Sequence, residues 1–162
     1  MAARRERGPR DASFEEAESQ ALDLSALTEI IGYPLRRAQM AVFEDFNRRF
    51  AALGLSPAQY SALVAIGDNP GRTQSTIAGA LGIQRPNFVA MMDELERRGL
   101  ADRLRSDADR RSHALVLTEA GRELVARARV VQAEQEAAIA RTLGEDGRKT
   151  LVALLRRLTQ IE

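Results

Sequence analysis

Three side chains that can bond to the edges of DNA bases stand together at residues 84–87, which read Gln84-Arg85-Pro86-Asn87. Arginine can place two parallel N–H bonds on guanine, and glutamine or asparagine can pair a donor and an acceptor with adenine. Pro86 suits the first turn of a helix, where its missing N–H costs nothing. The stretch is therefore typical of a helix that begins in the major groove. The alternative is an ordinary helix start with exposed polar residues.

A second set of polar residues lies between two short apolar segments and includes Asp109-Arg110-Arg111. An arginine in a narrow minor groove responds to groove width and negative potential. Asp109 can hold one guanidinium by a charge-assisted hydrogen bond. This pattern predicts a loop that contacts the minor groove, and a solvated surface turn is the alternative.

A third set, Thr73, Gln74 and Ser75, opens a short apolar stretch that reads as a helix. Side chains and free N–H groups at a helix start can donate to phosphate oxygens. We expect these three residues to contact the DNA backbone.

The elements that position these residues follow from the apolar spacing. Apolar residues three and four apart predict six helices, which start near Leu27, Pro57, Gln74, Gln84 and Glu119 and after Gly147. Two alternating segments, 101–105 and 113–117, predict a hairpin between the fourth and fifth helices. This order indicates a mainly α fold with a winged helix-turn-helix lobe and a two-stranded wing.

Close packing is expected where the third and fourth helices cross. Ala78 is small at the crossing, and Gly82 permits the tight turn between the helices. Five apolar side chains are expected to lock the pair into one core: Ile77, Leu81, Ile83, Phe88 and Val89.

The composition excludes several kinds of site. The chain has no cysteine and one histidine, so disulfides and thiolate or multi-histidine metal sites are not expected. Basic and acidic residues nearly balance at 24 and 23. All the basic residues except Lys149 are arginine, which fits either a coding bias or bidentate recognition of phosphates and bases. No cofactor or metal is expected, and His113 is interpreted as a wing or interface residue.

Residues 1–20 are polar, charged and without period, so we expect a mobile arm. They lack the apolar core of a secretory signal. No stretch approaches the roughly 18 apolar residues of a membrane span. A cytoplasmic protein without a membrane partner is expected.

Several motifs resemble the MarR family of bacterial transcriptional regulators, from about Ile31 to Leu158. They are Leu53 to Tyr60, Thr73 to Leu95, Arg97-Arg98-Gly99-Leu100, Asp109-Arg110-Arg111-Ser112 and Leu117-Thr118-Glu119-Ala120-Gly121. The recognition helix of that family often opens with an acidic or hydroxyl residue followed by Arg-Ser-Thr. Gln84-Arg85-Pro86-Asn87 departs from this pattern, so the resemblance does not carry over an operator sequence.

The resemblance implies an obligate homodimer that binds double-stranded DNA at a pseudo-palindromic operator. The long apolar first and last two helices support this, because a small DNA-binding lobe does not need so much apolar surface. We therefore expect a single domain over 21–162, with dimerisation helices at 27–53 and 118–162 and a winged-helix lobe at 56–117.

Relatives of this kind often bind a small molecule where the dimer helices meet the DNA-binding lobe. By position, the candidates here are Tyr33, Arg37, Met40, Phe43 and Tyr60. An arginine beside two tyrosines can hold the acid group of an aromatic carboxylate. Lack of cysteine excludes a thiol-based peroxide sensor, and the resemblance favours an aromatic acid or its thioester. The alternative is that Met40 and Phe43 are core residues and Arg37 is solvated or paired.

Other classes of function remain as competing hypotheses. An enzyme is not expected, since the chain has no glycine-framed serine, no phosphate loop with lysine and no histidine for a triad. A winged-helix module that binds only protein, and a DNA-binding protein without an effector, are the alternatives to a ligand-responsive repressor.

Overall fold

The structure is a computed structural model that describes residues 22–105 and 113–161, with Arg105 described in its backbone only. The chain divides into two units, residues 1–41 and 42–162. Each unit is described by itself.

In the first unit, a one-turn helix α2 (Ser25–Thr28) precedes the start of helix α3 (Gly32–Phe50). The prediction that one helix starts near Leu27 is therefore wrong. Pro34 lacks an N–H, and it lies in the first turn of α3, where that group would have no partner within the helix. The segment between the two helices forms a turn, which is held by backbone hydrogen bonds. One of them runs from the N–H of Tyr33 to the carbonyl of Ile30 at 2.9 Å.

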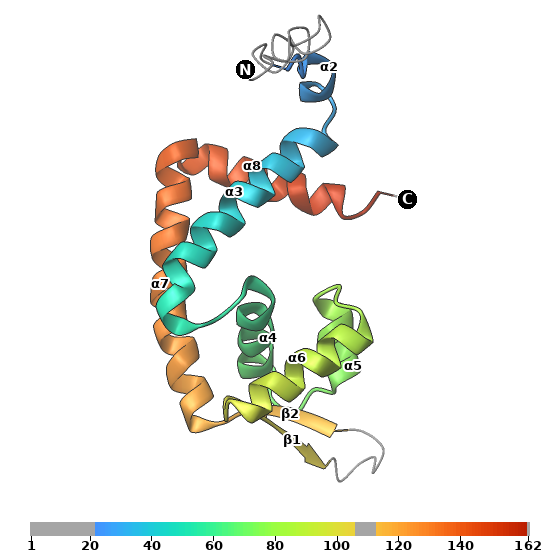
Figure 1. The fold of residues 1–162 in the computed structure, drawn as a ribbon, viewed down its shortest axis with the longest axis vertical. Coiled ribbons are helices and arrows are strands. Elements are labelled where there is room, and N and C mark those ends of the chain that lie inside the picture. Colours follow the sequence, from blue (N-terminus) through green and yellow to red (C-terminus); the bar gives the residue numbers. More distant parts are fainter. Residues whose placement is uncertain (1–21, 106–112, 162) are drawn as a thin grey trace, which may run out of the picture. The chain divides into compact units, whose positions relative to one another are not determined.

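The second unit contains the winged-helix lobe and two further helices (Figure 1). After α3 and a 3-10 turn η1 (Ala51–Leu53), its elements are α4 (Pro57–Asp68), α5 (Gln74–Ala80), α6 (Arg85–Arg97), β1 (Ala101–Arg105), β2 (His113–Leu117), α7 (Glu119–Leu143) and α8 (Glu145–Leu158). The mainly α winged-helix prediction is confirmed, and each of the six predicted helices is present.

Helix α8 starts earlier than the sequence pattern predicted. Gly144, with φ at 72°, separates α7 from α8, and Glu145 and Asp146 already form the first turn. Acidic residues are favourable there because the helix dipole is positive at its N-terminus. The predicted start after Gly147 is therefore too late, because it leaves both residues outside the helix.

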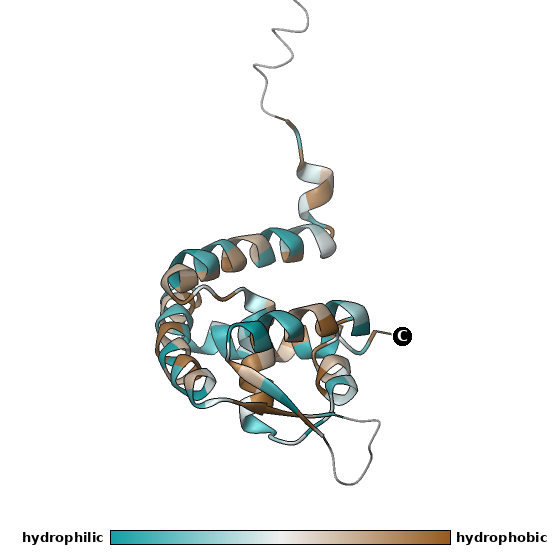
Figure 2. Cartoon of the chain, turned by 60° about the horizontal axis from the view of Figure 1, so that its bottom comes forward, coloured by the Kyte–Doolittle hydropathy of each residue, from teal (hydrophilic) through white to brown (hydrophobic). Residues whose placement is uncertain are grey.

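A single apolar core holds the lobe together. Phe50, Leu63, Phe88 and Met92 come from α3, α4 and α6 and are almost completely buried. Burial of each such side chain contributes about 1.5–3 kcal/mol. Hydrophobic and hydrophilic residues are interleaved along the helices (Figure 2), as expected where only one face of each helix is buried. The prediction that Val89 belongs to this core is wrong, since Val89 is 39% exposed.

Strand β2 is paired on both edges. It runs antiparallel to β1, with Ala101 opposite Leu117 and Arg105 opposite His113. On its other edge, the carbonyl and N–H of Leu115 bond to Gly71 and Arg72, both at 2.9 Å. The segment before α5 is thereby fixed to the sheet.

A buried amide joins α7 to α3 within the second unit. Gln135 is only 2% exposed, and its Nε2 donates to the carbonyl oxygen of Val42 at 3.0 Å. The amide also lies close enough to Asp45 to help lower the pKa of that carboxyl. Because an unpaired buried amide is costly, the bond to Val42 favours one packing of α7 on the C-terminal part of α3.

Candidate nucleic-acid interface

The turn between α5 and α6 is tightly fixed. Gly82 has a φ of 65°, in the left-handed region that glycine adopts without strain. The N–H of Ile83 then bonds to the carbonyl of Ala78 at 2.9 Å. Ala78 and Phe88 are buried on either side of this turn. The start of α6 is thus held rigidly against α5, as the sequence predicted.

The first turn of α6 presents its polar side chains to solvent. Gln84 is the N-cap, Pro86 occupies the first turn, and residues 84–87 are all exposed. Gln84 makes no side-chain cap bond. Among the residues that the structure describes, no hydrogen bond or ion pair engages the Arg85 side chain. The polar side chains at the start of α6 are therefore accessible from solvent, as the prediction of base contacts requires.

The start of α5 is only partly available for phosphate contact. The Thr73 hydroxyl caps the helix by accepting from the N–H of Thr76 at 3.3 Å. Gln74 is half-buried, and its Oε1 has no hydrogen-bond partner among residues 22–105 and 113–161. Ser75 is exposed. Of the three predicted phosphate-contacting residues, Ser75 is therefore the most accessible one.

The structure places the base of the wing beside α5 and α6. The predicted wing residues Asp109, Arg110 and Arg111 lie outside the described residues. His113 is exposed at the first position of β2. Within residues 22–105 and 113–161, no cluster of three potential metal ligands is found.

A set of contacts between β1 and α6 was missed by sequence reasoning. Arg103 on β1 pairs with Asp93 at 2.7 Å and with Glu96, both on α6. The signal in the sequence was two acids three residues apart on a helix, followed by an arginine in the next strand. Such spacing is too common to predict the contact, because either acid can equally face solvent.

The five predicted ligand-binding residues are divided between the two units. Tyr33, Arg37 and Met40 belong to the first unit, whereas Phe43 and Tyr60 belong to the second. Met40 and Phe43 are 55% and 45% exposed, which contradicts the alternative that they are core residues of this chain.

Tyr60 is the best-defined of these candidates. Its ring packs edge-on against Phe50, with 5.2 Å between centroids, and contacts Phe46. Burial raises the pKa of the Tyr60 hydroxyl, and Arg129 and Asp68 are close enough to modify that pKa in opposite directions. Tyr60 therefore combines an aromatic surface with a polar end near α7.

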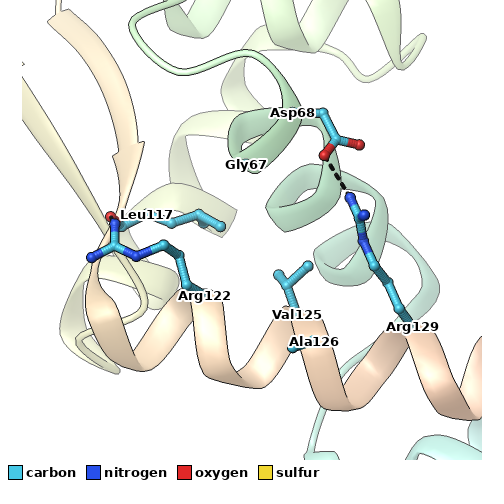
Figure 3. Close-up of a pocket in the computed structure, with 7 residues that line it drawn as sticks. All are labelled: Gly67, Asp68, Leu117, Arg122, Val125, Ala126 and Arg129. Atoms are coloured by element: carbon cyan, nitrogen blue, oxygen red, sulfur yellow. Dashed lines mark hydrogen bonds and ion pairs between the residues drawn. The ribbon is translucent and has the colours of Figure 1, made fainter.

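A shallow groove of about 240 Å³ lies between the end of α4 and the first half of α7 (Figure 3). Its apolar floor includes Val125 and Leu117. At one end Arg129 pairs with Asp68 at 2.5 Å. At the other end Arg122 donates to the carbonyl of Leu117 at 2.9 Å. Both guanidinium groups thus already have partners, and sequence reasoning did not predict the groove.

No single helix in the described part of the chain is long and apolar enough to cross a membrane. One bent pair of helices passes by length and composition together, but it includes α4, whose apolar face lies in the core.

Comparison with known proteins agrees with this geometry. A sequence model of the MarR family matches residues 53–112. A protein of Thauera aromatica, named as a transcriptional regulatory protein for the hcr operon, is 36% identical over 79% of this chain and 78% of its own length.

Two solved structures are similar over almost the whole chain. The transcriptional repressor CouR bound to a 23-mer DNA duplex is 48% identical, with a TM-score of 0.84, over 87% of this chain and 100% of CouR. CouR bound to p-coumaroyl-CoA is 45% identical, with a TM-score of 0.82, over 88% of this chain and 100% of CouR.

Proposed function

The chain belongs to the MarR family of transcriptional regulators, and from this premise we propose that it is a dimeric repressor released by a small aromatic ligand. The observation that carries the proposal is the exposed first turn of α6, where Gln84, Arg85 and Asn87 face solvent on a rigid helix-turn-helix. Two such helices on a two-fold axis would read half-sites about 34–36 Å apart, which is one turn of DNA.

The proposed DNA contacts divide into three groups. Gln84, Arg85 and Asn87 would bond to base edges in the major groove. Ser75, with Thr73 and Gln74, would contact phosphates and fix the register. Asp109, Arg110 and Arg111 stay a prediction for the minor groove.

Exposed apolar side chains support a homodimer. Val42 and Phe43 on α3 and Leu151 and Leu154 on α8 are each 40–48% exposed. Exposed apolar residues that recur along long helices mark an interaction surface. We infer that a second copy covers them, so that the predicted dimerisation helices at 27–53 and 118–162 serve that role.

The effector is proposed to be an aromatic acid or its coenzyme A thioester. The similar repressor CouR has been solved with p-coumaroyl-CoA, which is such a thioester. Tyr60 and the exposed Phe43 would supply aromatic surface, and Tyr33, Arg37 and Met40 remain candidates. The ligand must bind the DNA-incompetent arrangement more tightly than the competent one, since otherwise it shifts no population.

The proposal places the protein in the cytoplasm, where its DNA is, and assigns it no catalytic activity. A winged-helix module that binds only protein predicts that loss of Arg85 leaves DNA binding unchanged. A ligand-independent DNA-binding protein predicts operator binding that no aromatic ligand reverses.

The test is selection of duplexes from a random DNA library by the full chain. A repressor of the proposed kind should enrich an inverted repeat whose half-sites are centred about one helical turn apart. Enriched DNA should then be released by an aromatic acid or thioester from a panel that includes p-coumaroyl-CoA. No enrichment of any sequence would refute operator recognition, and enrichment without release by any panel member would refute the effector.

A further inference from the structure

Arg103 makes the most extensive polar contact between the wing strand β1 and helix α6. Its Nη2 lies 2.7 Å from Asp93 Oδ1 and donates to the carbonyl oxygen of Val89 at 3.3 Å. Its Nη1 pairs with Glu96. The side chain is only 16% exposed, whereas that of Asp93 is 62% exposed. One guanidinium therefore contacts α6 at three successive positions.

The backbone of Arg103 adds a fourth contact. Arg103 stands opposite Leu115 in the sheet, and Leu115 directs its N–H and carbonyl to Arg72 and Gly71 on the far edge. The facing pair exchanges no hydrogen bonds, so the N–H of Arg103 points away from β2. Glu96 Oε1 accepts this N–H at 3.0 Å. The free edge of β1 is thus fastened to α6.

The three contact positions define one face of the helix. Val89, Asp93 and Glu96 are separated by four and then three residues, which places them along a single stripe. Arg85 precedes Val89 by four residues and begins the same stripe. Any rotation of α6 about its axis that breaks the Arg103 contacts also turns Arg85 relative to the wing strand.

We propose that Arg103 is a positioning residue for operator recognition, which fixes the rotation of α6 against β1 and so sets where Arg85 points. The inference rests on the proposed function, because it requires α6 to read DNA. The planar guanidinium suits this role, since it can bond in several fixed directions at once. Arg103 is a poor phosphate ligand, because two carboxylates already hold it.

The main test replaces Arg103 with lysine, which keeps the charge but cannot reach three positions. Binding to an operator taken from the library selection, and to a duplex of unrelated sequence, is measured over a range of salt concentrations. Arg103→Lys should weaken operator binding roughly tenfold, the size of one impaired base contact. Binding to unrelated DNA and the salt dependence should not change, since no phosphate contact is lost.

Two further variants make the test specific. Arg129→Lys alters another interhelical ion pair, that with Asp68, which does not involve α6. It should leave operator binding unchanged. The double variant Asp93→Asn/Glu96→Gln keeps Arg103 but removes its charged partners. It should lower the ratio of operator to unrelated binding even though the added net positive charge strengthens binding to all DNA.

Because the double variant retains Arg103 and its aliphatic stem, it carries the test if Arg103→Lys does not fold. An unchanged ratio in the folded variants would overturn the proposal. Equal losses on both DNAs, with a salt slope reduced by about one, would also overturn it by making Arg103 a phosphate contact. Failure of the wild-type chain to select any operator would instead overturn the proposed function, and this inference with it.

Discussion

A β-carbon added to Gly121 on α7 would lie 1.9 Å from the carbonyl oxygen of Leu100. The contact belongs to the start of α7, where the Thr118 hydroxyl donates to the carbonyl of Gly99 at 2.6 Å and accepts the N–H of Gly121 at 3.0 Å. Leu100 directly precedes β1, so this close approach joins the long helix to the base of the wing. Steric exclusion of a β-carbon therefore explains why the motif Leu117-Thr118-Glu119-Ala120-Gly121 ends in glycine.

Gly121→Ala should destabilise the protein by about 3 kcal/mol, which is the upper end of the range for an overpacked site. The cost is high because the backbone of α7 or that of Leu100 must move to make room for the methyl group. Gly147→Ala is the matched control, since its added carbon would meet only the Leu143 side chain, at 3.5 Å. Gly147 is the third residue of α8, so that change should stabilise by less than the roughly 1 kcal/mol gained in a helix interior. Denaturant unfolding followed by circular dichroism measures both. Equal stabilities of the two variants would contradict the steric account.

Asp45 should stabilise the folded protein at neutral pH, and this contribution should be lost at low pH. The Arg49 side chain, which donates to Asp45 at 2.7 Å, holds the pKa of that carboxyl below its usual value of 3.8. Arg48 and Gln135 also lower this pKa, and burial opposes them. A lowered folded-state pKa means that the contribution is complete well above pH 3.8 and is lost as the pH falls through the lower, folded value.

The measurement compares the wild type with Asp45→Asn in denaturant unfolding at a series of pH values. The wild type should be more stable at neutral pH, and the difference should shrink below pH 3.8. If the difference in free energy of unfolding stays constant down to the pH at which the wild type unfolds, the lowered pKa of Asp45 does not contribute to stability.

Leu154→Glu should weaken the proposed dimer. Leu154 is 48% exposed on α8, so a charge there costs little in the isolated chain but is unfavourable if a second copy covers it. Analytical ultracentrifugation should show a shift from dimer to monomer. Arg157→Glu, on an exposed polar position of the same helix, provides the comparison. A dimer of unchanged affinity would place the interface elsewhere.

The aromatic effector should stabilise the folded protein. A ligand at 100 times its Kd raises the free energy of unfolding by about 2.7 kcal/mol if it binds only the native state. The melting temperature measured with p-coumaroyl-CoA, and with free aromatic acids, should therefore rise. Tyr60→Phe should reduce the rise while preserving the packing on Phe50. A rise equal to that of the wild type would exclude the Tyr60 hydroxyl from the site.

The helices and strands of the lobe could be predicted from sequence because their signals are local. Ser56 illustrates this, since it accepts the N–H of Gln59 while Gln59 Oε1 accepts the N–H of Ser56, as the spacing suggests. The resemblance to the MarR family, which also rests on local motifs, was confirmed by the comparison with known proteins. The start of α3 was harder, because apolar periodicity continues through a break that Pro34 and its neighbours create.

Contacts between distant segments could not be predicted in the same way. Gln135 reads as a surface residue of an amphipathic helix, yet it is buried against Val42, 93 positions away. Val89 reads as core, but only the packing of α6 shows that its side chain lies outside. The pairing of Arg103 with Asp93 depends on how the strand lies against the helix, and charge spacing alone does not fix that.

Recognition of bases by the first turn of α6 is the central claim, and substitution of Arg85 tests it most directly. Operator and unrelated DNA are titrated with wild type, Arg85→Ala and Arg127→Ala, the last removing an exposed arginine of α7 as the control. Arg85→Ala should cost about 1–3 kcal/mol in operator binding per half-site and relax the preference at one base pair. Arg127→Ala should preserve that preference. If Arg85→Ala binds the operator as tightly and as selectively as the wild type, α6 does not read DNA through this residue and the account is wrong.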